Sequence, residues 1–257
     1  MEQLTGIFDS HAHYDQKRFD ADREEVIAAL ADAGVTRVMN AASDLPSSRD
    51  AMALAEKYPF FWCSVGIHPH EAEDAPADYL DQLRELSKHP RVKAIGEIGL
   101  DYHYDFSPRD IQRRVFEEQL ILAKELDMPV IIHDREAHAE TLELLTKYRP
   151  RGVVHCFSGS AEMAAQVAQL GMYVGFTGTV TFKNARKPLE AVAAVPEDKI
   201  LMETDCPYMA PEPLRGRRCD SSMLPYTAAA MAAARGITPQ QMVDIAARNA
   251  CRLFGIE

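Results

Sequence analysis

The sequence predicts an α/β fold, a single (β/α)8 or TIM barrel that spans residues 1–257 as one domain. Eight short apolar runs alternate with longer helical patterns, which favours a parallel sheet with helices outside it. Spread over 257 residues, they give about 32 residues per unit, the size of one strand and helix in such a barrel. An open doubly wound sheet is the main alternative, but no G-x-G-x-x-G follows the first strand.

The expected strands are short runs rich in apolar and β-branched residues. They comprise residues 6–9, 37–41, 60–65, 92–96, 129–133, 152–156, 173–176 and 199–204. Helix caps are expected between them, at Asp22, at Ser107 with Pro108 in the first turn, at Ser160 and at Thr238. The runs that begin at Asp22, Ser160 and Thr238 stop at Gly34, Gly171 and Gly255.

The composition excludes several classes of protein. With 47% hydrophobic and 26% charged residues, the chain can bury a sizeable core, which excludes a disordered, collagen-like or disulfide-stapled chain. The net charge of −11 excludes non-specific coating of nucleic acid or anionic membranes. If the substrate is an anion, something local must attract it, and a metal centre is one candidate.

The sequence predicts a cytoplasmic protein with no membrane association and no evident obligate protein partner. The five cysteines stand alone, without a C-x-x-C pair, which is typical of a reducing compartment. The first residues have neither a basic nor an apolar segment of a secretory signal. The longest small apolar stretch, residues 227–236, is far shorter than the ~20 residues that cross a bilayer.

Potential metal ligands follow five of the expected strands. In extended backbone, residues two apart point to one side, so the first two ligands can converge on one ion. In a barrel, all these strand ends lie at the C-terminal face, where active sites are built. Imidazole and carboxylate together suit Zn, Mn, Fe or Ni, and six side chains exceed the needs of one tetrahedral ion, which predicts two divalent cations. The six residues are His11, His13, Glu97, His133, His155 and Asp205.

The sequence resembles the TatD family of metal-dependent deoxyribonucleases, within the wider amidohydrolase-type barrels. The resemblance covers nearly the whole chain through an ordered series of motifs: FDSHAHYD, VGIHPH, AIGEIGLDYH, PVIIHDREA, VVHCFSG, ETDCPYMAP and PEPLRGRR. It implies that a first metal is bound by His11, His13 and Asp205, a second by His133 and His155, with Glu97 as the bridge. His-rich ligation favours Zn or Mn, and the resemblance adds Mg as the metal that usually supports the family's nuclease activity. It also implies that single-stranded DNA is trimmed from its 3′ end.

Asp205 is the expected general acid-base, because it can accept the proton of the attacking water and return it to the leaving oxygen. Glu97 is the second expected catalytic residue, as the bridge between the metals. Two alternatives remain at this point. One is a hydrolase of the same fold that acts on a small amide, lactone or phosphoester, or on an aminoacyl-tRNA ester. The other is a metal-binding protein without turnover.

Other side chains near this face have two interpretations each. His68 and His70 contact the substrate phosphate or are loop histidines held by backbone; Arg135, like Asp101, contacts substrate or ligands or forms a structural ion pair. Arg215 forms a basic cluster with its neighbours, and the alternative is a solvated loop. The cluster comprises Arg215, Arg217 and Arg218.

Two further features concern residues beside the ligands. Glu203 shares strand parity with Asp205, so we expect it behind the ligands. After PEPLRG, the family pattern has a basic residue, another residue, and then Asn-Glu-Pro, whereas residues 217–221 here read RRCDS. Residues 219–221 therefore lack the Asn and the Pro, which weakens the substrate assignment and leaves the metal assignment intact.

Overall fold

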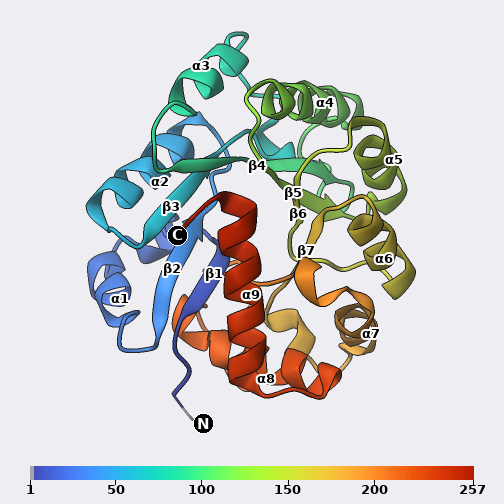
Figure 1. Cartoon of the computed structure of the whole chain (residues 1–257). Coiled ribbons are helices and arrows are strands. Elements are labelled where there is room, and N and C mark those ends of the chain that lie inside the picture. The colour runs from blue at the N-terminus through green and yellow to red at the C-terminus, as the bar shows by residue number, and fades with distance from the viewer. Residues whose placement is uncertain (1–2) are drawn as a thin grey trace.

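The computed structural model, which describes residues 3–257, contains one sheet of eight parallel strands in the order β1 to β8. Beyond the paired strands, Ala12 and Cys206 form an isolated parallel bridge that joins the end of β1 to the segment after β8. The sheet thus curves into a nearly closed barrel, with helices outside it (Figure 1). The (β/α)8 prediction is confirmed, and an open doubly wound sheet is excluded by the strand order.

All eight expected strands are present. They are β1 (Ile7–Ala12), β2 (Val35–Asn40), β3 (Phe61–Val65), β4 (Val92–Asp101), β5 (Val130–Arg135), β6 (Gly152–Val154), β7 (Tyr173–Phe176) and β8 (Ile200–Met202). β4 runs five residues beyond the predicted end at Gly96 and pairs with β5 as far as Asp101 and Arg135. Gly99 permits this close approach, because a Cβ there would lie 1.9 Å from the carbonyl oxygen of His133.

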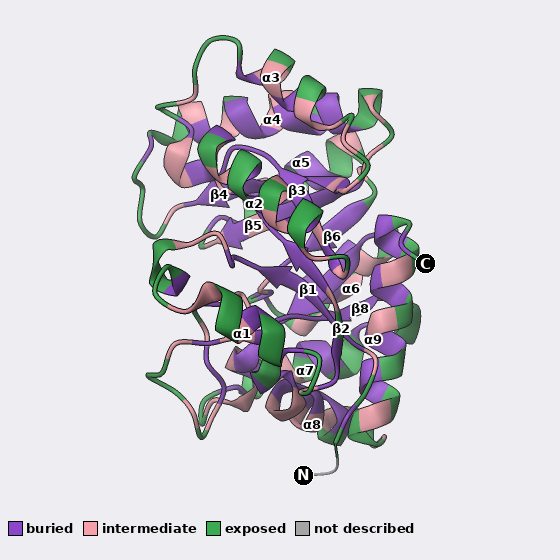
Figure 2. Ribbon diagram, turned by 90° about the vertical axis from the view of Figure 1, so that its left-hand side faces the viewer, coloured by how far each residue is buried: buried purple, intermediate pink, exposed green. Residues whose placement is uncertain are grey.

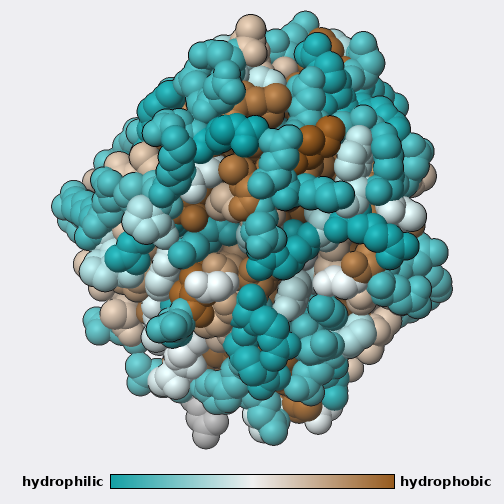
Figure 3. All heavy atoms as spheres, turned by 45° about the horizontal axis from the view of Figure 1, so that its top comes forward, coloured by the Kyte–Doolittle hydropathy of each residue, from teal (hydrophilic) through white to brown (hydrophobic). Residues whose placement is uncertain are grey.

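The helices cover the outer face of the sheet. They are α1 (Arg23–Ala29), α2 (Leu45–Lys57), α3 (Tyr79–Leu86), α4 (Arg109–Glu125), α5 (His138–Tyr148), α6 (Ala161–Gln169), α7 (Arg186–Ala194), α8 (Leu224–Arg235) and α9 (Pro239–Phe254). Figure 2 shows buried strands at the centre and helices whose outer faces are exposed. The surface in Figure 3 is largely hydrophilic, with apolar side chains in small patches. No helix within residues 3–257 is long and apolar enough to cross a membrane.

Two of the four predicted helix caps form as expected. The Ser160 side chain accepts a hydrogen bond from Met163 N at the start of α6, and Thr238 forms a complete capping box with Gln241 at the start of α9.

Asp22 is the N-cap residue of α1, as expected, but its side chain makes no capping hydrogen bond, and the cap expected at Ser107 is wrong. Asp22 makes no side-chain cap and instead pairs with Arg218 at 2.6 Å. Pro108 occupies the cap position of α4, while the Ser107 hydroxyl donates to the His70 carbonyl oxygen at 3.0 Å. In both cases a tertiary partner competes successfully with the local backbone.

The last helix, α9, covers one end of the barrel. It packs against β1 and β8 and lies across the front of the barrel in Figure 1. A cluster of buried apolar side chains lies at this end of the barrel and includes one residue near the start of each of six strands: Phe8, Ala94, Ile131, Val153, Tyr173 and Leu201. They pack with Leu253 and Phe254 of α9. The N-terminal end of the barrel is therefore filled with apolar side chains, and the C-terminal end is left for polar ones.

Candidate metal centre

A cavity of about 520 Å³ opens at the C-terminal ends of the strands. Its lining includes five of the six expected ligands, and the sixth, His11, is fully buried. The strand-end argument therefore identified residues that the fold brings together. The side chains form two groups of donor atoms on either side of Glu97.

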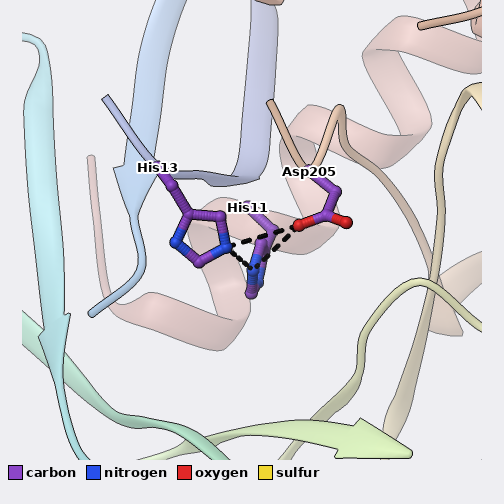
Figure 4. Close-up of side chains that lie close together, drawn as sticks. All are labelled: His11, His13 and Asp205. Atoms are coloured by element: carbon purple, nitrogen blue, oxygen red, sulfur yellow. Dashed lines mark hydrogen bonds and ion pairs between the residues drawn. The ribbon is translucent and has the colours of Figure 1, made fainter. Parts of the chain in front are cut away.

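The first group comprises His11, His13 and Asp205. The two Nε2 atoms of the histidines lie 3.0 Å apart, and Asp205 Oδ1 lies 3.8 and 3.3 Å from them (Figure 4). His13 Nδ1 lies 2.9 Å from the carbonyl oxygen of Ala41, so Nδ1 donates there and Nε2 keeps its lone pair. Buried nitrogen and carboxylate donors that converge in this way fit a divalent cation such as Zn or Mn.

The second group comprises His133 and His155, which lie around Oε1 of Glu97. Glu97 Oε1 lies 2.8 Å from His133 Nδ1 and 2.6 Å from His155 Nε2, and the two nitrogens are 3.5 Å apart. Glu97 Oε2 instead faces the first group, at 3.2 Å from His11 and 3.5 Å from His13. One carboxylate therefore divides its two oxygens between two groups of ligands.

Asp205 reaches the first group through an unusual backbone conformation. Its φ of +60° lies in the left-handed region, which residues other than glycine rarely adopt. Its N–H donates to the carbonyl oxygen of His11 at 2.9 Å, which fixes this turn after β8 to the end of β1. Local strain held by surrounding hydrogen bonds is common at functional sites.

Asp101 orients two of the cavity histidines. Its Oδ2 lies 3.0 Å from His133 Nε2 and 2.8 Å from His70 Nε2, while Oδ1 accepts the N–H of His103 and that of Tyr104. With Nε2 of His133 donating to Asp101, Nδ1 is free to face the metal site. Of the two interpretations of Asp101, ligand orientation agrees with the structure.

Glu203 lies behind His155, as its strand parity predicts. Its Oε1 is 3.6 Å from His155 Nδ1, and its Oε2 accepts the hydroxyl of Ser10 at 3.1 Å. β7 leaves space for this carboxylate because residue 175 is glycine: a Cβ on Gly175 would lie 2.4 Å from Glu203 Oε2.

His68 is buried beside Glu97 and the donor groups. Its Nε2 is 3.5 Å from Glu97 Oε1, and its donor atom groups with those of Glu97 and His133. Burial lowers the pKa of His68 to about 4, so its imidazole is neutral and can act as a ligand or a hydrogen-bonding partner. His70 also lines the cavity, where Asp101 holds it.

Burial and the neighbouring imidazoles act in opposite directions on the carboxylates. Burial opposes the ionisation of Glu97, but the charges of His155 and His11 hold its pKa well below the usual range. Burial likewise opposes ionisation of Asp205, whose pKa is lowered chiefly by its contact with His13. Both side chains are therefore carboxylates, the form that binds cations.

The arginines differ in their access to the cavity. Arg135 belongs to its lining, and its guanidinium lies 4.8 Å from the ring centroid of Tyr104. Arg215 is exposed, lies outside the lining and covers the ring of Phe182 at 4.3 Å. Arg218 binds both carboxylate oxygens of Asp22, at 2.7 and 2.6 Å. The expected basic cluster therefore does not include Arg218 as a free cation.

Three aromatic side chains at the cavity escaped the sequence analysis. Tyr104, Phe106 and Tyr208 line it and are 47%, 64% and 43% exposed. For Tyr104 and Phe106, the available signal was the segment YHYDF after β4, where aromatic residues stand in a loop that no core pattern requires.

Comparison with known proteins agrees with this geometry. The family model described as "TatD related DNase" matches residues 8–255. The chain belongs to the TatD family. It is 42% identical to the Bacillus subtilis protein named "uncharacterized metal-dependent hydrolase YabD", over 97% of this chain and 99% of that one. It is 36% identical to the "3'-5' ssDNA/RNA exonuclease TatD" of Citrobacter rodentium, over 97% and 98% of the two chains.

The solved structures place the fold within the same family. The TatD homologue YJJV of Escherichia coli K12 superposes with a TM-score of 0.93 at 31% identity, covering 98% of this chain and 99% of that one. This TatD-family chain is therefore a metal-dependent hydrolase, as its donor groups indicate, and the alternative of a metal-binding protein without turnover is set aside.

Proposed function

We propose that this TatD-family protein uses two divalent cations to cleave phosphodiester bonds and removes nucleotides from the 3′ end of single-stranded DNA. The observation that carries the proposal is the division of Glu97: one oxygen faces His11 and His13, and the other faces His133 and His155. Two metal ions placed in this way are typical of phosphatases and nucleases. The relatives named as exonucleases support the choice of a nucleic-acid substrate.

Each cation would have its own protein ligands and share Glu97. The first set comprises His11, His13 and Asp205, and the second comprises His133 and His155, with His68 as a neighbouring donor. Divalent cations held there would supply acidification of a water molecule and neutralisation of phosphate charge. The donor chemistry accommodates Zn and Mn, and the family resemblance adds Mg.

Asp205 is the residue that we assign to proton transfer. Its side chain is 13% exposed, compared with 4% for Glu97, so water can reach Asp205 while Glu97 is enclosed. Asp205 would accept the proton of the attacking water and return it to the leaving oxygen. Glu97, surrounded by histidines, would bind both cations and fix the position of the two ligand groups relative to each other.

The acidic chain attracts an anionic substrate locally. Arg135 supplies a guanidinium inside the cavity lining, where it can bind a phosphate in two-pronged fashion. His70, held by Asp101, presents a second polar ring to the same cavity. Arg215 lies outside the lining and would contact only more distant phosphates of a longer strand.

An oligonucleotide assay tests the proposal. We expect the metal-loaded protein to degrade a 5′-labelled single-stranded DNA into a ladder that shortens from the 3′ end, and chelation to stop it. Duplex DNA and RNA of the same sequence test selectivity, and a 3′-phosphorylated strand tests polarity. If the DNA stays intact while a small ester or lactone is hydrolysed, the same-fold alternative replaces the nuclease.

A further inference from the structure

The mouth of the cavity carries an aromatic surface that metal binding does not require. Of the four large hydrophobic side chains with high exposure in the described residues, three line this cavity. Two of them, Tyr104 and Phe106, stack on each other with centroids 5.3 Å apart and an interplanar angle of 24°. An aromatic pair exposed beside a polar site is typical of a binding surface.

The pair is held in place on both sides. The His70 ring makes T-shaped contacts with both aromatic rings, at 5.4 and 4.8 Å between centroids, and Arg135 lies over Tyr104. The backbone on the N-terminal side is fixed where Tyr104 N donates to Asp101 Oδ1 at 2.9 Å. On the other side, the Ser107 carbonyl oxygen accepts from Gln112 Nε2 at 2.8 Å. The rings are therefore preorganised in the absence of substrate.

The same contacts connect the aromatic pair to the second donor group. Asp101 binds both the backbone of Tyr104 and Nε2 of His133, whose other nitrogen faces Glu97. A ligand that lies on Phe106 is consequently held at a fixed distance from the site of hydrolysis. Arg135 stands beside it to receive a phosphate.

We propose that Tyr104 and Phe106 form a base-stacking subsite, which binds the nucleobase next to the scissile phosphodiester; this rests on the proposed nuclease function. Phe106, 64% exposed, offers accessible ring surface to a base, and Tyr104 stacks against it. Every nucleobase has a π face, so the subsite favours a base without selecting its identity. An abasic sugar or a small ester has no aromatic face to stack and gains much less from this surface.

The test compares two 3′ ends on the metal-loaded, full-length protein. One 5′-labelled single strand ends in thymidine, and its partner ends in an abasic tetrahydrofuran residue. We expect Phe106→Ala to raise KM for the thymidine end by roughly 5- to 100-fold, the range of a lost base stack, and to leave the abasic end unchanged. Phe106→Trp should retain the preference, whereas Phe106→Leu, apolar but not aromatic, should lose most of it.

Ile121→Ala is the matched control, because Ile121 is a 45% exposed apolar side chain on α4, outside the cavity lining. It should process both ends as the unsubstituted protein does. A second readout does not depend on cleavage: emission from Phe106→Trp should be quenched by a strand whose 3′ linkages are cleavage-resistant phosphorothioates. The corresponding abasic strand should quench it far less.

The outcomes separate the two proposals. Equal kcat/KM for the two ends in the unsubstituted protein, with active cleavage, overturns the subsite and leaves the nuclease function standing. Failure to cleave any strand overturns the nuclease function, and the quenching experiment then decides the subsite: base-dependent quenching supports it, and equal quenching by both strands overturns it.

Discussion

Glu97 is the residue on which the proposed arrangement of two metal ions depends. Its two oxygens face different histidine pairs, and its charge offsets the repulsion between two cations held close together. Glu97→Gln keeps the volume but removes that charge. We expect bound metal to fall from about two ions per chain to one or fewer, with loss of activity. Elemental analysis of the purified protein measures this.

The control for Glu97 is Glu71→Gln, a carboxylate in the cavity lining that belongs to neither donor group. It should keep the metal content of the unsubstituted protein. Equal metal content in the Glu97 and Glu71 variants would contradict the bridging role.

Asp205 is the residue that we assign to proton transfer, and its replacement by Asn tests that role. Asn has nearly the same shape and still offers an oxygen to a metal, but it cannot accept a proton at neutral pH. Asp205→Asn should therefore lower turnover by about 10²–10⁴-fold. The loss should appear in kcat more than in KM, since the missing interaction belongs to the transition state.

Metal content and the melting temperature of the Asp205 variant should stay close to those of the unsubstituted protein. Near-normal turnover would mean that another group accepts the proton, with His68 and Glu203 as the nearest alternatives. A large drop in the melting temperature would instead mean that Asp205 has a structural role.

The sequence could predict that the six candidate ligands lie together because each follows an apolar run, and barrel geometry then places all strand ends together. It could not decide between the interpretations of Asp101 or of His68. Asp101 acts through His133 and His70, which belong to other segments of the chain, so its role depends on contacts that no local pattern contains. The depth of His68 beside Glu97 likewise follows from how β3 and β4 pack.

At the scale of elements, strand identity was predictable and strand length was not. The prediction ended the fourth strand at Gly96. β4 continues to Asp101, since Gly99 allows its backbone to approach the carbonyl oxygen of His133. This extension is what brings Asp101 beside His133.

The loop after β8 separates two kinds of arginine. Arg215 and Arg217 are exposed, whereas Arg218 joins Asp22 to this loop and covers the ring of Phe19 at 4.6 Å. If the two exposed cations contact phosphates of a single strand, replacing both with Ala should flatten the slope of log KM against log salt by about 1.4. Steady-state kinetics over a range of salt concentrations measures this slope.

Arg218→Ala is the matched substitution in the same loop. It should lower the melting temperature, because an ion pair between distant segments is lost, and leave the salt slope intact. An unchanged slope in the double variant would assign Arg215 and Arg217 to an ordinary solvated surface.

The whole molecule separates stability from chemistry along the barrel. Apolar side chains and α9 fill the end where the strands begin, while the end where they finish gathers charged and polar groups in a cavity. The net charge of −11 would repel a nucleic acid, so under the proposed function attraction would be confined to that cavity, where Arg135 and bound cations would offset the charge. The net charge follows from the composition, whereas only the fold shows that Arg135 lines the cavity.

Metal removal should lower the stability of the whole folded chain. The donors come from segments between β1 and the turn after β8, so they converge only in the folded chain, and cations that bind there stabilise it. At a free metal concentration 100 times the Kd, the stabilisation is about 2.7 kcal/mol. For a domain of this size, this corresponds to a melting temperature higher by roughly 5–10 °C. Chelation should lower the melting temperature measured by calorimetry by this amount, and returning Mn or Zn should restore it.

Phe106→Ala should retain the full shift in melting temperature, since Phe106 contacts no ligand of the metal centre, whereas Glu97→Gln should lose most of it. An identical melting temperature with and without metal would contradict a centre assembled by folding.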